Sequence, residues 1–157
     1  MSGMSDKRQL YRVRALTGDD AEIIEAIDAG YSAALGTSTT ASAGSASFHS
    51  RTGHSFVAEL DGEPRGFVLA TAIWTGGRPL VRMERLATRD PDDMPAREAL
   101  LAALVKSAYD AGVYDLLAEL PDADSRGAEA LEATDFRPAR VRMFERVLGS
   151  RGQAAAQ

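Results

Sequence analysis

Residues 78–112 read RPLVRMERLATRDPDDMPAREALLAALVKSAYDAG, and this stretch decides the fold because it joins a strand to a helix through an acidic turn. Apolar and polar side chains alternate over residues 79–88, which predicts a strand with one buried face. Apolar residues at helical spacing over residues 96–111 predict a helix, with Pro95 in its first turn and Gly112 at its end. A helix that begins just past the carboxyl end of a strand can offer its first amides to a phosphate.

The alternation in this strand fails at one point. Leu86 follows Met83 by three residues instead of two, so one extra residue near Glu84–Arg85 is needed to keep both side chains on one face. A β-bulge supplies such a residue, and bulges are frequent beside functional sites. We therefore predict a bulge at Glu84–Arg85 and expect the functional site close to it.

Composition restricts the class of protein. The chain of 157 residues is long enough for one domain, and its formal net charge of −5 disfavours nucleic acid and anionic membranes as partners. The absence of cysteine excludes disulfides, thiolate metal sites and a cysteine nucleophile. No run approaches the roughly 20 apolar residues that span a bilayer, and no apolar signal core begins the sequence, so we expect a cytoplasmic protein.

The remaining elements extend this unit into one domain over residues 9–148, with residues 1–8 and 149–157 expected to be disordered tails. We expect further strands at residues 9–16, 54–60, 65–75, 113–120 and 138–148, and helices from a cap at Thr17 to about Gly36 and over residues 125–134. A meander followed by a right-handed crossover predicts a mixed sheet with helices on both faces.

Two internal segments need separate interpretation. Residues 36–53 consist mostly of Ser, Thr, Ala and Gly, which predicts a flexible loop, either a plain linker or a cover over a substrate. Residues 67–74 are almost continuously apolar, which predicts a central strand covered on both faces, with Trp74 in the core.

This order of elements, with RMERLAT at residues 82–88 and AEALEATDF at residues 128–136, resembles the GNAT acetyltransferase superfamily over about residues 10–148. The resemblance implies an α+β fold of three layers, α-β-α, with a mixed, mostly antiparallel sheet. It further implies an acyl-CoA-dependent N-acyltransferase that binds acetyl-CoA as co-substrate between strands 79–88 and 113–120. The acceptor would be a small amine or a peptide N-terminus that attacks the thioester directly.

The resemblance also assigns roles to residues. Glu84 would be the general base and take the amine proton directly or through one water. The main chain at Leu86 and Thr88 would hold the cofactor, and the helix start at Ala96 and Arg97 would meet its pyrophosphate.

The sequence departs from the superfamily pattern at three places. The turn at residues 89–97 contains no glycine and carries three aspartates, which repel a diphosphate. Leu131 stands where the superfamily usually has a Tyr, Asp124 replaces the Asn before it, and Asp135-Phe136 replaces Gly-Phe. These changes support an alternative function, a GNAT-like domain that binds a ligand or partner without catalysis.

Several charged residues allow a second interpretation. Glu84 can pair with Arg82 or Arg85, and Arg97 can lie on a solvated helix face instead of holding a phosphate. His49 and His54 lack the neighbouring ligands for a metal site, and either can accept a proton. Arginines around the last strand either attract an anion or pair with the excess acidic residues: Arg137, Arg140, Arg142 and Arg146. The sequence is compatible with a homodimer but does not determine the oligomeric state.

Overall fold

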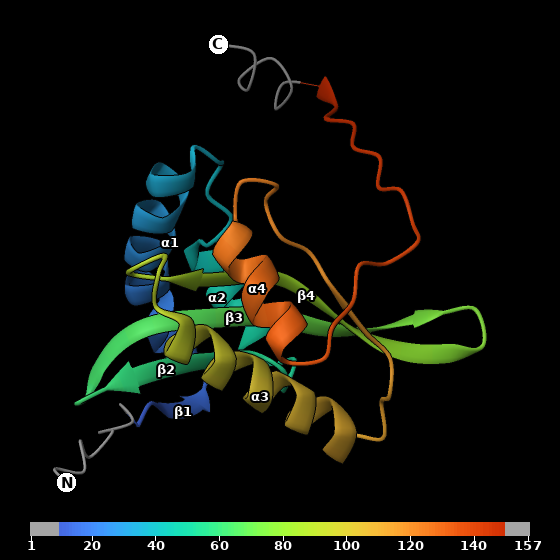
Figure 1. The fold of residues 1–157 in the computed structure, drawn as a ribbon, viewed down its shortest axis with the longest axis horizontal. Helices are drawn as coiled ribbons and strands as arrows, with labels where there is room; N and C mark the ends of the chain where they lie inside the picture. Colours follow the sequence, from blue (N-terminus) through green and yellow to red (C-terminus); the bar gives the residue numbers. More distant parts are fainter. Residues whose placement is uncertain (1–9, 150–157) are drawn as a thin grey trace, which may run out of the picture.

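The computed structural model describes residues 10–149, which form one sheet with strand order β1-β2-β3-β4-β5 (Figure 1). The antiparallel meander contains four strands: β1 (Arg12–Ala15), β2 (Phe56–Leu60), β3 (Glu63–Thr75) and β4 (Arg78–Thr88). Helix α3 (Met94–Asp110) connects β4 to β5 (Leu116–Ala118), which pairs with β4 in parallel. The mixed, mostly antiparallel sheet and the crossover are as predicted.

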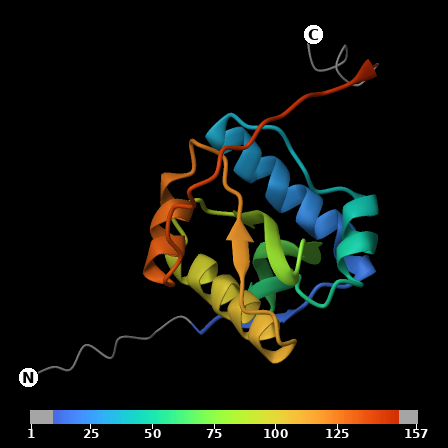
Figure 2. The same ribbon diagram turned by 90° about the vertical axis from the view of Figure 1, so that its right-hand side faces the viewer.

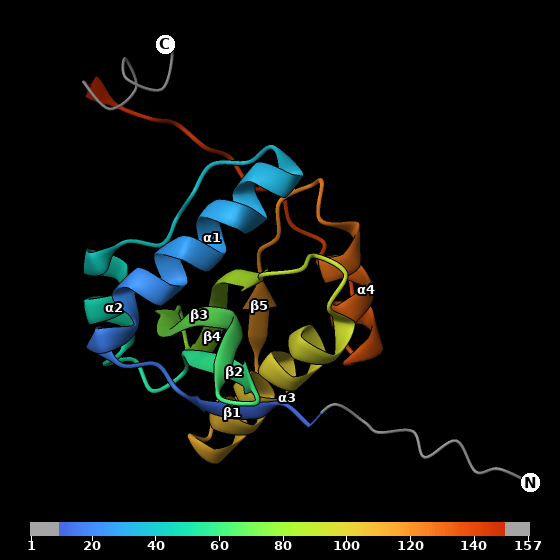
Figure 3. The same ribbon diagram turned by 90° about the vertical axis from the view of Figure 1, so that its left-hand side faces the viewer.

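Helices cover both faces of the sheet, so the three-layer α-β-α architecture is confirmed (Figure 3). On one face lie α1 (Ala21–Leu35), preceded by a 3-10 turn at Gly18–Asp20, and α2 (Ala43–His49); on the other lie α3 and α4 (Ser125–Ala133). The core on the α1 side contains Ile24, Ile27, Tyr31, Val57, Phe67, Leu69 and Ala87, and the core on the α3 side contains Val68, Met83, Leu86, Leu100, Leu101 and Leu104. No helix within residues 10–149 has the length and apolar character to cross a membrane.

The predicted bulge is confirmed and its position is Glu84. Leu69 of β3 pairs with Arg85, whereas the next residue, Ala70, pairs with Met83. Glu84 therefore has no partner in β3. The extra residue returns Leu86 to the face that carries Met83, and it turns Arg85 to the α1 side.

The segment 36–53, predicted as a loop without regular structure, contains α2. Ser42 caps this helix by accepting a hydrogen bond from the Ser45 amide at 3.1 Å, and Ser45 Oγ accepts from the Ser42 amide at 2.6 Å. Such a reciprocal cap satisfies two amides that would otherwise lack partners. The helix escaped prediction because it buries only the small Ala46 and His49, so it has no apolar stripe.

The outer half of β3 is not a covered central strand. Phe67–Ala70 are buried as predicted, but Trp74 is 74% exposed, so its placement in the core was wrong. Beyond Val68 no residue of β2 pairs with β3, and the β3–β4 hairpin extends past the helical layers (Figure 1). The apolar composition of this half-strand therefore does not reflect burial inside the described chain.

The final strand predicted at residues 138–148 is also wrong for the described structure. These residues form no ladder with β5 and run away from the body of the domain (Figure 1). The predicted tails lie outside the described residues, except Gly149.

We expect Gly66→Ala to lower the free energy of unfolding by about 1–3 kcal/mol, because overpacking displaces neighbouring groups. A Cβ at Gly66 would lie 2.9 Å from the Ala87 carbonyl oxygen and 2.9 Å from Thr88 Cγ2. Gly30 of α1 is exposed with no atom near its Cβ position, so Gly30→Ala should raise that free energy by about 0.5–1 kcal/mol. The midpoint of urea denaturation measures both changes in the free energy of unfolding, provided that the slope m stays constant. Destabilisation by both variants would contradict the expectation.

Candidate functional site

Strands β4 and β5 part beyond Met83. The ladder between them begins with a hydrogen bond from Val81 N to Asp115 O at 2.9 Å and ends with one from Glu119 N to Met83 O at 3.1 Å. Strand β4 continues to Thr88, whereas β5 ends at Ala118. The second half of β4 therefore has an edge that no described strand pairs.

The main-chain groups of Leu86 and Thr88 point to this free edge. Arg89 N donates to Arg65 O at 2.8 Å, so Arg89 faces β3. Because main-chain groups alternate along an antiparallel strand, Ala87 faces β3 as well, and Leu86 and Thr88 face the parting strands. The resemblance to the GNAT superfamily implied cofactor binding by Leu86 and Thr88, and their backbone orientation suits an extended chain with amide groups.

The bulge residue Glu84 is paired with a buried histidine. Glu84 Oε2 lies 3.0 Å from His49 Nε2, and the Glu84 side chain is 42% exposed. His49 Nδ1 lies 3.4 Å from the Thr71 hydroxyl. The tautomer with its proton on Nε2 satisfies both contacts, donating to Glu84 and accepting from Thr71. His49 thus orients the carboxylate and leaves its second oxygen free to accept a proton.

The arginines expected beside Glu84 have other partners. Arg82 bonds to Glu119. Arg85 is buried and donates from Nε to Asp28 Oδ1 at 2.7 Å and from its terminal nitrogen to Ser32 Oγ at 2.7 Å. Neither arginine competes with His49 for Glu84.

The same buried carboxylate positions the segment that carries His49. Asp28 Oδ2 accepts hydrogen bonds from the amides of Thr40 at 2.6 Å and Ala41 at 2.8 Å, just before α2 begins. Arg85 also donates to Ser38 O at 3.1 Å. The Arg85–Asp28 pair therefore links the bulge of β4 to α1 and to the start of α2.

The acidic turn satisfies its own amides. The amides of Asp92 and Asp93 donate to Asp90, and that of Met94 donates to Asp92 O. Asp93 Oδ1 caps α3 by accepting from Ala96 N at 3.1 Å, and Asp93 O accepts from Arg97 N at 3.3 Å. Pro95 has no N–H. Every amide between Asp92 and Arg97 thus donates to an acceptor within the protein, so none of these amides is free to meet a diphosphate in this structure.

Tyr11 strengthens this closed arrangement. Its hydroxyl donates to Asp93 Oδ2. Burial, followed by the hydrogen bond to Asp93, raises the pKa of the Tyr11 hydroxyl, so the donor keeps its proton. Both oxygens of Asp93 are therefore occupied, and the carboxylate is held at the start of α3.

Arg97 is neither on a solvated helix face nor available as a phosphate clamp. It is fully buried, and its terminal nitrogens donate to both Asp124 oxygens at 3.0 and 3.1 Å. Its Nε and one terminal nitrogen also donate to Pro91 O. Both interpretations assumed an exposed side chain, whereas Asp124, which also caps α4 at Gly127 N, fixes the guanidinium inside.

Tyr31 completes a buried cluster across the sheet. Its hydroxyl donates to Asp124 Oδ2, and its ring lies 4.8 Å from Arg85 Cζ and 5.8 Å from Arg97 Cζ. Burial raises the pKa of this hydroxyl, so it remains a donor. Because α1 and α3 lie on opposite faces, Tyr31 and Arg97 can share Asp124 only where β4 and β5 part. Side chains of the protein therefore fill the gap.

Sequence reasoning missed this cluster because its signal is weak. Tyr31 fits the apolar stripe of α1, and Asp124 is visible only as a replacement for the Asn of the superfamily. A buried hydroxyl or carboxylate needs a partner, but that partner is far along the chain. The only sequence clue to the cluster was therefore the departure at Asp124.

The remaining predicted residues lie apart from the gap. His54 Nδ1 lies 2.7 Å from Ser107 Oγ of α3, so His54 and His49 are on opposite faces of the sheet. Burial lowers the pKa of His54. Within residues 10–149 no group of three or more His, Cys, Asp or Glu side chains could hold a metal ion.

Comparison with known proteins gives a family and a fold. A family model described as "Protein of unknown function (DUF1999)" matches residues 11–156. No curated protein matches the chain. The crystal structure of wild-type TTHA1254 from Thermus thermophilus is 37% identical, with 88% of this chain and 98% of that chain covered and a TM-score of 0.74.

Two more distant structures carry names that state an activity. A ribosomal-protein-alanine N-acetyltransferase from Brucella melitensis biovar Abortus 2308 is 18% identical over 89% of this chain and 100% of that one, with a TM-score of 0.69. The aminoglycoside acetyltransferase meta-AAC0020 from an uncultured soil metagenomic sample, in complex with sisomicin, is 14% identical over 88% and 97%, with a TM-score of 0.70. At these identities they show the fold alone, and the predicted GNAT fold is confirmed.

We expect Arg97→Met to lower the free energy of unfolding by about 3–5 kcal/mol, because it leaves Asp124 buried without its charge partner. The double variant Arg97→Met/Asp124→Asn should be no less stable than the worse single variant, since Asn retains the α4 cap without the charge. Arg126→Met, which removes an exposed guanidinium bound to Asp92, should change little. A double-mutant cycle from urea denaturation measures the coupling, and additive losses would contradict it.

Proposed function

Since the chain belongs to the family described as a protein of unknown function (DUF1999) and has the GNAT fold, we propose that it is an acyl-CoA-dependent N-acyltransferase. The observation that carries this proposal is the bulge at Glu84. It presents a carboxylate oriented by His49 beside the free main-chain edge of Leu86 and Thr88. The transferred group is acetyl in the first instance, and the acceptor is a small amine or a peptide N-terminus.

Each residue has a limited task in this proposal. Acetyl-CoA, when bound, supplies a thioester-activated acetyl group to the attacking amine. Glu84 takes the proton that the amine loses, directly or through one water, with the oxygen that His49 does not occupy. The amides and carbonyls of Leu86 and Thr88 hold the extended arm of the co-substrate by hydrogen bonds. The segment 36–53, which contains α2, partly encloses the acceptor.

The residues fit the two ends of acetyl-CoA unequally. The free edge at Leu86 and Thr88 fits the thioester arm. The turn before α3 does not fit the diphosphate, because its amides are engaged and Arg97 is buried. We therefore assign the diphosphate to no residue of the turn, and we propose that binding of the arm displaces Tyr31 from Asp124.

One set of observations favours a second function, a GNAT-fold domain that binds a ligand or partner without catalysis. The Tyr31–Asp124–Arg97 cluster fills the gap where the thioester arm would lie. The self-bonded acidic turn then serves only to cap α3. In this alternative Glu84 and His49 form a structural pair on the α1 side of the sheet.

A melting experiment with acetyl-CoA separates the two functions. Binding at 100 times the dissociation constant stabilises a protein by about 2.7 kcal/mol, which for this size raises Tm by roughly 5–10 °C. We expect such a rise with acetyl-CoA and none with ADP alone, because the turn offers the diphosphate no amides. Tyr31→Phe, which loses the hydroxyl that bonds to Asp124, should increase the acetyl-CoA response. No shift at millimolar acetyl-CoA would favour the non-catalytic domain.

We expect Glu84→Gln to reduce acetyl transfer by roughly 10²–10⁴-fold, the range for loss of a general base, with the acetyl-CoA melting shift unchanged. The measurement is thiol release from acetyl-CoA with a panel of small amines and peptide N-termini. Glu25→Gln, which neutralises an exposed carboxylate on α1, is the matched control and should retain full activity. Full activity of Glu84→Gln would exclude Glu84 as the general base, but it would not contradict the proposal that the protein is an acyltransferase.

A further inference from the structure

The segment after α4 has the pattern of a strand but no strand partner within the described chain. We call residues 138–148, PARVRMFERVL, the C-terminal arm. Its side chains alternate between apolar and basic from Ala139 to Met143. It leaves the body of the domain in an extended path (Figures 1 and 2). Its large apolar side chains are between 44% and 91% exposed: Val141, Met143, Phe144, Val147 and Leu148.

The sheet offers a matching free edge. Strand β5 pairs with β4 on one side and is the last strand in the sheet order, so its other edge is unpaired within residues 10–149. Unpaired edges readily accept a further strand. An edge of this kind supplies the main-chain partners that the arm lacks.

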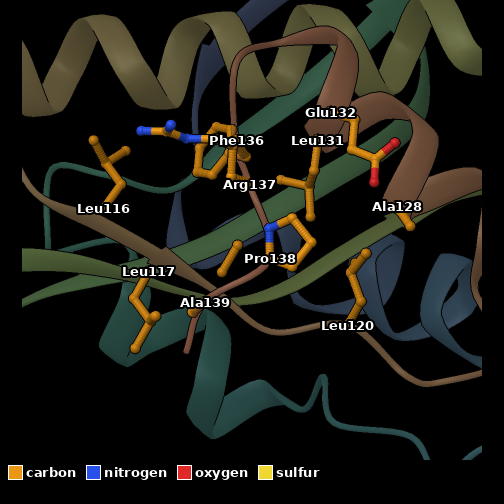
Figure 4. A pocket seen from close by; sticks show the side chains of 11 residues that line it. Leu116, Leu117, Leu120, Ala128, Leu131, Glu132, Phe136, Arg137, Pro138 and Ala139 are labelled. Atoms are coloured by element: carbon orange, nitrogen blue, oxygen red, sulfur yellow. The ribbon is translucent and has the colours of Figure 1, made fainter. Parts of the chain in front are cut away.

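An apolar groove runs beside this edge, between β5 and α4. Its lining includes Leu116, Leu117, Leu120, Leu131, Phe136 and Pro138 (Figure 4). Pro138 and Ala139 of the arm also lie at the groove, so the arm begins beside β5 and then departs from it. The groove can receive the apolar face of a strand that pairs with β5.

Charge favours the same contact. The arm has three arginines and one glutamate, a net charge of +2, so the other residues of a chain with −5 carry −7. Four carboxylates flank β5 and the groove: Asp115 and Glu119 pair with Arg78 and Arg82, whereas Glu132 and Asp135 have no ion-pair partner within residues 10–149. The basic face of an arm paired with β5 would therefore meet acidic surroundings.

The start of the arm directs it away from its own β5. Asp135, two residues after the end of α4, has a left-handed φ of 69°, and Phe136 N donates to Leu131 O at 2.9 Å. Pro138 has a restricted φ and keeps the preceding residue extended, which opposes a bend back to the sheet. A second copy of the chain can receive the arm without such a bend.

We propose that two copies of the chain exchange their arms, each arm pairing as an added strand with the β5 edge of the other copy. The apolar face of the arm, Val141 and Met143, covers the groove beside β5. Reciprocal exchange closes both edges under two-fold symmetry, so the assembly stops at a dimer. The dimer also removes from water Val141 and Met143, which the single chain exposes.

Mass measurement by light scattering on the full chain tests the dimer. We expect twice the 16.7 kDa of one chain over a wide range of concentration. Val141→Lys/Met143→Lys should return the mass to that of one chain. Trp74→Lys is the matched control, because it places a lysine on another exposed apolar residue, in the β3–β4 hairpin, and should remain a dimer. A monomeric wild type, or a monomeric Trp74→Lys beside a dimeric arm variant, overturns the proposal.

Introduced cysteines distinguish exchange from an arm that folds back on its own chain, since the protein has none of its own. A mixture of Leu117→Cys and Val141→Cys chains, unfolded together and refolded, should give a disulfide-linked dimer on a non-reducing gel. The double variant should also give linked dimers. If the mixture stays unlinked while the double variant closes within single chains, the arm belongs to its own β5 and exchange is excluded.

Discussion

One extra residue in β4 is the constraint on which the rest of the structure depends. Because Glu84 has no partner in β3, Arg85 falls on the α1 face while Met83 and Leu86 remain on the α3 face. Arg85 then reaches Asp28, and Asp28 holds the segment that leads into α2. His49 at the end of α2 returns to Glu84. A shift by one residue would reverse these faces and separate every one of these contacts.

The two sides of the candidate site differ in whether their polar groups are accessible to a ligand. On the α1 side, Glu84 is oriented by a buried histidine and partly open to solvent, as a base that meets an acceptor must be. In the gap, the Tyr31–Asp124–Arg97 cluster satisfies three buried polar groups with one another. Buried ion pairs contribute little net stability but are costly to break singly. Opening the gap therefore requires a ligand that replaces the lost hydrogen bonds.

The aspartates of the turn illustrate how context decides the meaning of charge. Their negative charges, considered from the sequence alone, are expected to repel a diphosphate. In the structure, Asp90 and Asp93 accept amide hydrogen bonds at the start of α3, where negative charge is favourable. Similarly, the apolar residues of the C-terminal arm and Trp74 suggest burial but lie on the surface. In both cases the properties of the single residues did not identify the groups that their side chains contact.

Local periodicity was enough to predict the strand–turn–helix unit and the bulge at Glu84–Arg85, because both depend on residues within a few positions of one another. The parallel crossover and the mixed sheet followed from the order of the elements along the chain. Only the tertiary structure decided that Arg97 is buried against Asp124, that His49 meets Glu84, that a helix forms over Ala43–His49, and that residues 138–148 leave their own sheet. These outcomes depend on partners tens of residues away. Alternation and helical spacing specify which face a side chain takes, but not which side chain it meets there.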